Sequence, residues 1–254
     1  MPVVLVTGAG RGLGLGLATR YLEAGWEVIA TVRDAPAPAV VALHARYPSR
    51  LSIENVDLED FASIEACARQ LRGRTIDVLL GNAAATYPDA GFGRTDYAAW
   101  ARLMQVNTFA QLKLAEAFAE NVAASARRIV FFVSSRVGAA PTPGMIPYRS
   151  SKSALNQVVF QLALLLQCRG VCVACGHPGY VKTDATGQRG VFTVEESAHR
   201  LFLLIDRLQL TDSGKFFDPD GSELPIVTRQ TDPAAAGAAP ANIVASTVTQ
   251  ASLR

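Results

Sequence analysis

The sequence predicts a three-layer α/β fold, a single domain in which helices cover both faces of a doubly wound parallel sheet. Short strand-like runs alternate with helical patterns along almost the whole chain of 254 residues. The runs are apolar at nearly every position, as in 3-VVLVT-7 and 128-RIVFFV-133, which is typical of parallel strands buried on both faces. Half of the residues are hydrophobic, so a large core is available.

Six strands and five helices are predicted in alternation. Apolar residues recur at helical spacing between the strands, as at Leu13 and Leu17. We expect Gly25 to end the first helix, and Thr193 with Glu196 to form a capping box at the last one. The predicted strands cover residues 3–7, 27–32, 51–56, 76–80, 128–133 and 171–176, and the predicted helices 12–24, 61–72, 97–124, 148–168 and 193–208.

The composition changes at Gln230. Residues 1–229 carry the predicted domain, whereas residues 230–254 are rich in Ala, Pro and Thr and carry almost no charge. Such a composition is typical of a C-terminal extension without a core of its own.

Charge and hydropathy argue against two classes of partner. The net charge is +2, from 24 basic and 22 acidic residues without a Lys/Arg block, so no nucleic-acid surface is predicted. The densest apolar run, 158-VVFQLALLL-166, is too short for a membrane span, which needs about 20 residues. The N-terminus lacks the basic region of a signal peptide. We therefore expect a cytoplasmic protein without a membrane partner.

Cys172 and Cys175 form a C-x-x-C pair close to His177, a pattern that can indicate zinc. Both lie in the predicted strand 171-VCVACG-176, where positions 172 and 175 point to opposite faces. A second pair of ligands is also missing. We predict no metal site and interpret these cysteines as buried reduced thiols.

A glycine-rich turn, 7-TGAGRGLG-14, follows the first strand. Gly8, Gly12 and Gly14 let the backbone turn sharply and approach a pyrophosphate. The helix that begins there offers N–H groups and the positive end of its dipole to the phosphates. Strand, turn and helix in this order predict a dinucleotide site in a Rossmann-like domain, in preference to a purely structural turn.

The end of the second strand, 31-TVRD-34, bears on the choice of cofactor. An acidic residue here would bond the 2′-hydroxyl of NAD, whereas an arginine accommodates the 2′-phosphate of NADP. If Val32 is the tip of the strand, Arg33 favours NADP, with Arg11 of the glycine turn as a second cation. If the register shifts, Asp34 reaches the ribose and the choice reverses to NAD. We favour NADP.

Four motifs occur in order: 7-TGAGRGLG-14, 81-GNAA-84, 104-MQVN-107, and 134-SS-135 with 148-YRSSK-152. With these motifs, residues 1–228 resemble the short-chain dehydrogenase/reductase family. Within it, the stretches 30-ATVRD-34, 134-SSRVG-138, 177-HPGYVKTD-184 and 214-GKFFDPDG-221 look most like the C-factor type of carbonyl reductase. The resemblance implies that residues 1–229 form a dinucleotide-binding and catalytic domain.

The resemblance assigns four catalytic residues: Asn107, Ser135, Tyr148 and Lys152. Ser135 is chosen over Ser134 because it precedes the tyrosine by the family's usual 13 residues. We expect Tyr148 to exchange a proton with the substrate oxygen and Ser135 to hydrogen-bond that oxygen. Asn107, which interrupts the helical stretch 97–124, is expected to hold a water that relays protons to Lys152.

The resemblance also implies cofactor contacts. Asp57 resembles an aspartate that contacts the adenine, Asn82 an asparagine that ties the central strands together, and 178-PGYVKT-183 a loop that cups the nicotinamide. The full predicted cofactor-binding set is Gly8, Arg11, Gly12, Leu13, Gly14, Arg33, Asp57, Leu58, Asn82, Ala83, Tyr148, Lys152, Pro178, Gly179, Val181 and Thr183.

The spacing of Tyr148 and Lys152 has a chemical reason. Residues i and i+4 share one face of a helix, so the lysine can lie beside the tyrosine. A phenol is a poor proton shuttle at its reference pKa of about 10, and a nearby cation favours the phenolate and lowers that pKa. We expect the small residues Ser150 and Ser151 to let the cofactor lie close.

Two features depart from the family pattern. Ala84 stands where the family has the glycine of N-A-G, and we expect its methyl group to be tolerated. Only residues 184–192 separate Thr183 from the last long helix, which predicts an abbreviated substrate lid and an open site. The expected pocket walls are mostly apolar and suit a small aldehyde, ketone or secondary alcohol: Ala85, Thr86, Tyr87, Met145, Tyr180 and Val191.

The intact tetrad favours an NADP(H)-dependent carbonyl reductase. The alternatives are a dinucleotide-binding signalling or regulatory protein of C-factor type, and an NAD-dependent alcohol dehydrogenase. We interpret Arg136 and His177 as structural residues in preference to substrate ligands. The family's usual assembly through the helices near 97–124 and 148–168 implies a homodimer or homotetramer.

Overall fold

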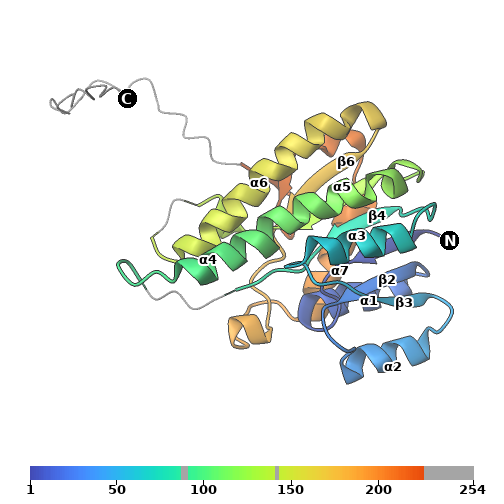
Figure 1. Ribbon diagram of the computed structural model, residues 1–254, viewed down its shortest axis with the longest axis horizontal. Coiled ribbons are helices and arrows are strands. Elements are labelled where there is room, and N and C mark those ends of the chain that lie inside the picture. Colours follow the sequence, from blue (N-terminus) through green and yellow to red (C-terminus); the bar gives the residue numbers. More distant parts are fainter. Residues whose placement is uncertain (87–90, 141–142, 226–254) are drawn as a thin grey trace, which may run out of the picture.

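An eight-stranded sheet forms the middle layer of the structure, a computed structural model that describes residues 1–86, 91–140 and 143–225 (Figure 1). The strand order is β3-β2-β1-β4-β5-β6-β7-β8; β1 to β7 are parallel and β8 is antiparallel to β7. The chain thus moves outward from β1 in one direction and then, from β4, in the other. This order confirms the predicted doubly wound sheet, and ligands of such sheets bind at the carboxyl edge where the order reverses.

All six predicted strands are present, and their bounds agree with the prediction to within two residues. The strands are β1 (Val3–Val6), β2 (Glu27–Val32), β3 (Leu51–Asn55), β4 (Val78–Gly81), β5 (Ile129–Val133), β6 (Cys172–Gly176), β7 (Phe216–Phe217) and β8 (Glu223–Leu224). The last two were not predicted, because two-residue strands leave no periodic pattern.

The helices are α1 (Gly12–Glu23), α2 (Pro38–Arg46), α3 (Phe61–Gln70), α4 (Tyr97–Met104), α5 (Ala110–Ala123), α6 (Ile146–Leu166) and α7 (Val194–Arg207). The predicted helix 97–124 is two α-helices joined by a π-helical turn, Gln105–Phe109. α2 was not predicted, because it buries only Val40 and Leu43 and so has a short apolar stripe.

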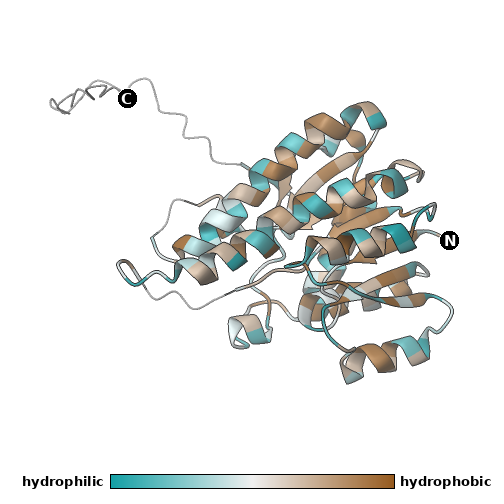
Figure 2. Cartoon of the chain, viewed as in Figure 1, coloured by the Kyte–Doolittle hydropathy of each residue, from teal (hydrophilic) through white to brown (hydrophobic). Residues whose placement is uncertain are grey.

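Each face of the sheet has its own core. Side chains of α1, α2 and α7 pack on one face, and those of α3, α5 and α6 pack on the other. Figure 2 shows the central strands as largely hydrophobic, whereas the helices alternate between hydrophobic and hydrophilic residues. Cys172 belongs to the first core and Cys175 to the second, so the two thiols lie on opposite faces as predicted. Burial raises the pKa of both.

The predicted helix signals are confirmed. Gly25 has φ +86° directly after α1, and the N–H of Trp26 bonds the carbonyl of Tyr21 across this turn at 3.0 Å. At α7, the Glu196 N–H donates to Thr193 Oγ1 at 3.1 Å, and the Thr193 N–H donates to Glu196 Oε2 at 2.8 Å. No helix among the described residues is both long enough and apolar enough to cross a membrane.

We expect Thr193→Ala to lower the free energy of unfolding by about 1 kcal/mol, because one amide of the first turn of α7 loses its acceptor. Thr193→Ser keeps the hydroxyl and is the matched control. Chemical denaturation of both variants measures the difference, and equal stabilities would show that the cap contributes nothing.

Candidate active site

A polar joint connects the carboxyl ends of the two central strands. Thr7, directly after β1, accepts hydrogen bonds at Oγ1 from the N–H groups of Asn82 and Ala83, at 3.0 and 3.1 Å. Asn82 Nδ2 donates in return to the Thr7 carbonyl at 2.9 Å. This joint fixes the segment after β4 beside the glycine turn. Asn82 was predicted in this role and Thr7 was not, although a polar residue at the end of an apolar strand could have indicated it.

The glycine turn lies directly against this joint. A Cβ on Gly8, which has φ +67°, would lie 2.8 Å from the Cβ of Ala83, and a Cβ on Gly14 would collide with the Gly8 carbonyl. α1 begins at Gly12, and its N-cap residue Arg11 makes no side-chain capping bond. Gly12 and Gly14 leave backbone without side chains at two positions in the first turn of this twelve-residue helix, as the pyrophosphate of a dinucleotide requires.

Val32 is the last residue of β2, so Arg33 is the first residue beyond the strand. The Arg33 Nε pairs with Asp34 Oδ2 at 3.2 Å, and both side chains are exposed. Arg11 is also exposed. Val32 is thus the tip of the strand, as the preference for NADP assumed. Asp34 is an acidic neighbour beside Arg33.

Two predicted cofactor contacts follow β3, and the first of them, Asp57, is the predicted adenine contact. Asp57 accepts a hydrogen bond at Oδ1 from the Glu59 N–H at 2.9 Å and donates its own N–H to Ser63 Oγ at 3.0 Å. Leu58 is buried in the core, so its side chain faces away from any ligand and its backbone alone could contact one.

Ser135, Tyr148 and Lys152 lie together at the carboxyl end of β5. Ser135 is buried and shares a side-chain hydrogen bond with Tyr148. The Lys152 Nζ lies 5.9 Å from the centroid of the Tyr148 ring and donates to the Val133 carbonyl at 3.0 Å. Lys152 is 2% exposed, so its ammonium group is held inside the protein.

Burial moves the pKa values of this cluster toward the neutral forms. It raises the pKa of Tyr148, which the hydrogen bond with Ser135 partly opposes. It lowers the pKa of Lys152 to about 8, with the thiol of Cys175 acting in the opposite direction. The expected lowering of the Tyr148 pKa by Lys152 is absent, because desolvation dominates and Ser135 supplies the opposing interaction.

Asn107 is fully buried in the π-helical turn between α4 and α5. Its Oδ1 accepts from the Ala85 N–H at 2.7 Å, and its Nδ2 donates to the Ala85 carbonyl at 3.0 Å and to Ser151 Oγ at 3.1 Å. The side chain thus joins the segment after β4 to α6, close to Tyr148 and Lys152. Single π-helical turns inside helices are frequent at functional sites.

The two serines between Tyr148 and Lys152 both form hydrogen bonds to other helical segments. Ser151 is fully buried and bonds Asn107, and Ser150 Oγ accepts from Trp100 Nε1 at 3.0 Å. Their hydroxyls therefore fasten α6 to the neighbouring helical segments. That their small size also lets the cofactor lie close stays a prediction.

The loop after β6 reaches the glycine turn. A Cβ on Gly12 would lie 3.5 Å from Thr183 Cγ2. The Pro178 carbonyl accepts from Ser197 Oγ at 2.7 Å, and Gly179 has φ +86° with Phe192 packed against it. The predicted nicotinamide loop is thereby held between α7 and the start of α1.

The two ends of the predicted short lid, residues 184–192, lie next to each other. Val181 bridges to Phe192, and the Lys182 N–H donates to the Phe192 carbonyl at 2.9 Å. One 3-10 turn, Asp184–Thr186, lies between these ends. Of the expected pocket walls, Met145, Tyr180 and Val191 are exposed, as in an open site, and Tyr87 lies outside the described residues.

The short chain dehydrogenase family matches the chain over residues 2–191. The chain belongs to the short-chain dehydrogenase family. It is 32% identical to the 1-hydroxy-2-glutathionyl-2-methyl-3-butene dehydrogenase of Rhodococcus sp. (strain AD45), over 88% of this chain and 99% of that protein.

Two further similarities bear on this short-chain dehydrogenase. It is 35% identical to the C-signal protein of Myxococcus xanthus, over 59% of this chain and 92% of that protein. Its fold matches the crystal structure of an NADPH-bound carbonyl reductase from chicken fatty liver with a TM-score of 0.81 and 28% identity, over 88% of this chain and 99% of that one. As an enzyme of this family, it acts on CH–OH or C=O groups with NAD(P).

The buried Lys152 predicts a dependence of stability on pH. Its pKa is about 8 in the folded chain against 10.5 as the ordinary value, so the unfolded chain binds the extra proton between these values. Stability should therefore rise from about pH 8 to pH 10.5, by about 3 kcal/mol at roughly 1.4 kcal/mol per pKa unit. Below about pH 8 the full cost of the buried charge is present.

Chemical denaturation at several pH values, compared between the wild type and Lys152→Met, isolates this contribution. The unfolding free energy of the wild type should rise relative to that of Lys152→Met as the pH increases from about 8 to 10.5. A difference that is constant with pH would contradict the buried ammonium.

Proposed function

We propose that this chain is an NADP(H)-dependent oxidoreductase that transfers a hydride between the nicotinamide and a small carbonyl or secondary alcohol substrate. The observation that carries the proposal is the cluster of Ser135, Tyr148 and Lys152 at the same sheet edge as the glycine turn. A binding protein without turnover would have no use for a phenol in contact with a serine and a buried ammonium group.

In carbonyl reduction, the Tyr148 hydroxyl donates its proton to the substrate oxygen, and the Ser135 hydroxyl hydrogen-bonds that oxygen as its negative charge develops. Bound NADPH supplies the hydride. Lys152, whose pKa burial lowers to about 8, then restores the proton to Tyr148. Asn107 holds the α6 start in place through Ser151, and we propose that it also holds the water of the proton relay.

We propose that NADP is preferred over NAD. Arg33 follows the tip of β2, Arg11 lies at the start of α1, and both are exposed for a 2′-phosphate. The chicken enzyme of similar fold was solved with NADPH. The further cofactor contacts proposed are Gly8, Gly12, Leu13, Gly14, Asp57, the backbone of Leu58, Asn82, Ala83, Tyr148, Lys152, Pro178, Gly179, Val181 and Thr183.

A signalling role is the second candidate, and the similarity to the C-signal protein of Myxococcus xanthus favours it. In this alternative the chain binds a dinucleotide, and its biological output does not need turnover. The Tyr148→Phe variant separates the two, because it removes the acid and keeps the ring.

We also propose that the protein works in the cytoplasm as a homodimer or homotetramer. The support for assembly is the exposed apolar surface on α6, where Phe160, Leu164 and Leu165 are 43%, 57% and 68% exposed. The Ala/Pro-rich extension 230–254 lies outside the described residues, and its separation from the domain 1–229 stays a prediction.

Tyr148→Phe should reduce NADPH-dependent carbonyl reduction by a factor of at least about 10² to 10⁴, the usual contribution of a general acid. NADPH binding, measured by fluorescence titration, should be nearly unchanged because the ring stays. Full activity in this variant would exclude Tyr148 as the acid. Unchanged signalling output beside lost reduction would support the second candidate.

Arg33→Ala should weaken NADP binding by on the order of tenfold, the loss expected for a charge-assisted hydrogen bond, and leave NAD binding nearly unchanged. Calorimetric titration of both cofactors against wild type and variant measures the ratio. Asp34→Asn is the companion variant, and it should strengthen NADP binding because the competing carboxylate is removed. Equal NADP affinity in Arg33→Ala and the wild type would refute the phosphate assignment.

A further inference from the structure

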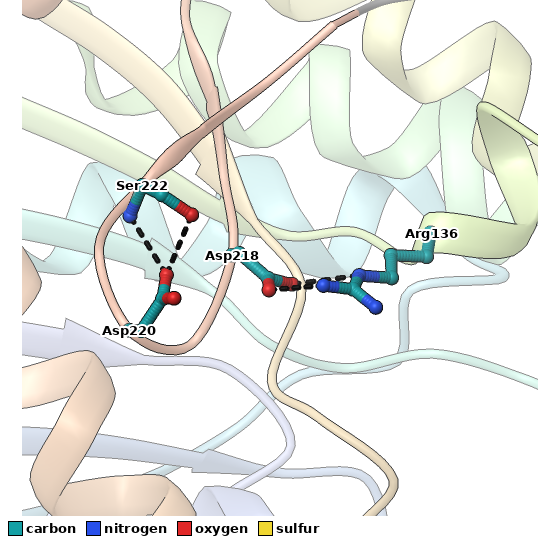
Figure 3. Close-up of polar contacts among 4 residues, drawn as sticks. All are labelled: Arg136, Asp218, Asp220 and Ser222. Carbon is teal, nitrogen blue, oxygen red and sulfur yellow. Dashed lines mark hydrogen bonds and ion pairs between the residues drawn. The ribbon is translucent and has the colours of Figure 1, made fainter.

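Arg136, the residue directly after Ser135, forms a two-point ion pair with Asp218 (Figure 3). Its Nε donates to Asp218 Oδ1 at 2.8 Å, and its Nη2 bonds Oδ2. The Asp218 side chain is 11% exposed and that of Arg136 is 56% exposed. A guanidinium group that meets a carboxylate at two points fixes orientation as well as distance.

Asp218 belongs to a tight turn between β7 and β8. Its N–H donates to the Ser222 carbonyl at 2.9 Å, and its carbonyl accepts from the Gly221 N–H at 2.8 Å. Within the same turn, Asp220 Oδ1 accepts from both the N–H and the hydroxyl of Ser222. β7 is paired with β6, so Arg136 is tied to a turn that is itself anchored in the sheet.

The other side of the Arg136 segment is fastened to α6. The 3-10 turn Arg136–Gly138 packs so tightly that a Cβ on Gly138 would lie 2.7 Å from the backbone carbon of Lys152. Ser153 Oγ donates to the Gly138 carbonyl at 2.5 Å, and Arg149 Nη1 donates to the Val137 carbonyl at 3.1 Å. The helix that carries Tyr148 and Lys152 therefore holds one side of this turn.

Ser135 is the N-cap of the same turn. Its carbonyl accepts from the Gly138 N–H at 3.0 Å, and its Oγ accepts from the Val137 N–H at 3.4 Å. A rotation of the turn would therefore move the Ser135 hydroxyl relative to Tyr148. The hydrogen bonds to α6 hold one side of the turn. The Arg136–Asp218 pair holds the other side, which faces the turn after β7.

His177 adjoins the pair without competing for it. Burial lowers the pKa of His177 to about 4, with Asp218 opposing this shift and Arg136 reinforcing it. The imidazole is neutral near pH 7, so it is no cationic partner for Asp218, and the guanidinium of Arg136 fills that role.

We propose that Arg136 and Asp218 are positioning residues for Ser135, which hold the turn after β5 so that the serine hydroxyl meets Tyr148 and the substrate oxygen. The catalytic consequence rests on the proposed function, whereas the fixing of the turn does not. Arg136 is thereby assigned a contact within the protein in place of an anionic substrate.

A double-mutant cycle tests the catalytic part. Asp218→Asn, which keeps the shape and removes the charge, should lower kcat by about tenfold, with a smaller change in the KM for NADPH. In the Ser135→Ala background the same change should lower kcat by less than about twofold, because the group it positions is gone. Arg136→Lys keeps the charge without the two-point contact, and it should fall between the wild type and Asp218→Asn.

Asp206→Asn is the matched control. Asp206 pairs with Arg127 Nη2 at 2.9 Å near the start of β5, the end of the strand opposite to Ser135. Loss of this pair should leave kcat unchanged in both backgrounds. An equal loss of kcat from Asp218→Asn with and without Ser135 would overturn the positioning role, as would an unchanged kcat in Asp218→Asn.

Amide hydrogen exchange tests the fixing of the turn without any turnover. The N–H groups of Val137 and Gly138 should exchange about tenfold faster in Asp218→Asn than in Asp206→Asn, because the turn opens more often. Equal exchange rates in the two variants would overturn the proposal. A wild type that never oxidises NADPH would count against the proposed function alone, because the exchange comparison still decides the role of the pair.

Discussion

The hydrogen bond from the Lys152 Nζ to the Val133 carbonyl is the interaction on which the rest of the site depends. It joins α6 to the last residue of β5, across 19 positions of sequence. Ser135 follows this strand end by two residues, and Tyr148 precedes the lysine by one helical turn. This buried contact thus lies between Ser135 and Tyr148 and holds Lys152 beside them. The ammonium group is shielded from water and donates to the Val133 carbonyl, which fixes its position.

The parallel sheet makes this contact useful. β1, β4, β5 and β6 run in the same direction, so the residues that follow them lie along one edge. Thr7 and Asn82 close the gap between the first two strands, and Thr183 reaches the start of α1 from the loop after the last. The predicted phosphate-binding turn and the Ser135–Tyr148–Lys152 cluster therefore lie along the same edge of the sheet, although they come from distant parts of the sequence.

The sequence predicted the features that are written in local patterns. The six main strands, the stop at Gly25 and the capping box at Thr193 each follow from spacing and residue type within a few positions. The family resemblance then named Ser135, Tyr148 and Lys152, which the structure brings together. The π-helical turn at Asn107 was foreseen only as an interruption, because the extra residue in the turn depends on packing against Ala85 and Ser151.

What the sequence did not predict are pairings between residues far apart. Arg136 and Asp218 are separated by 82 positions, and neither lies in a periodic pattern that would indicate a partner. Ser150 and Ser151 looked like small residues that make space, yet each hydroxyl has a partner on another helical segment. The hydrogen-bond partner of a polar side chain depends on which element the fold places opposite it. Local sequence patterns do not show that placement.

The pKa values of the cluster favour one direction of chemistry in the free chain. Burial raises the pKa of Tyr148, so the phenol keeps its proton at neutral pH and is ready to act as an acid. Burial also brings the pKa of Lys152 to about 8, so the lysine can release a proton near neutral pH to a neighbouring phenolate. Reduction of a carbonyl needs the protonated phenol because a proton must be delivered, although the raised pKa makes Tyr148 a weaker acid than a free phenol. Oxidation of an alcohol needs the phenolate as a base, and added positive charge beside Tyr148 would favour it. The proposed reaction would therefore use the same residues in both directions, with Tyr148 protonated for reduction and deprotonated for oxidation.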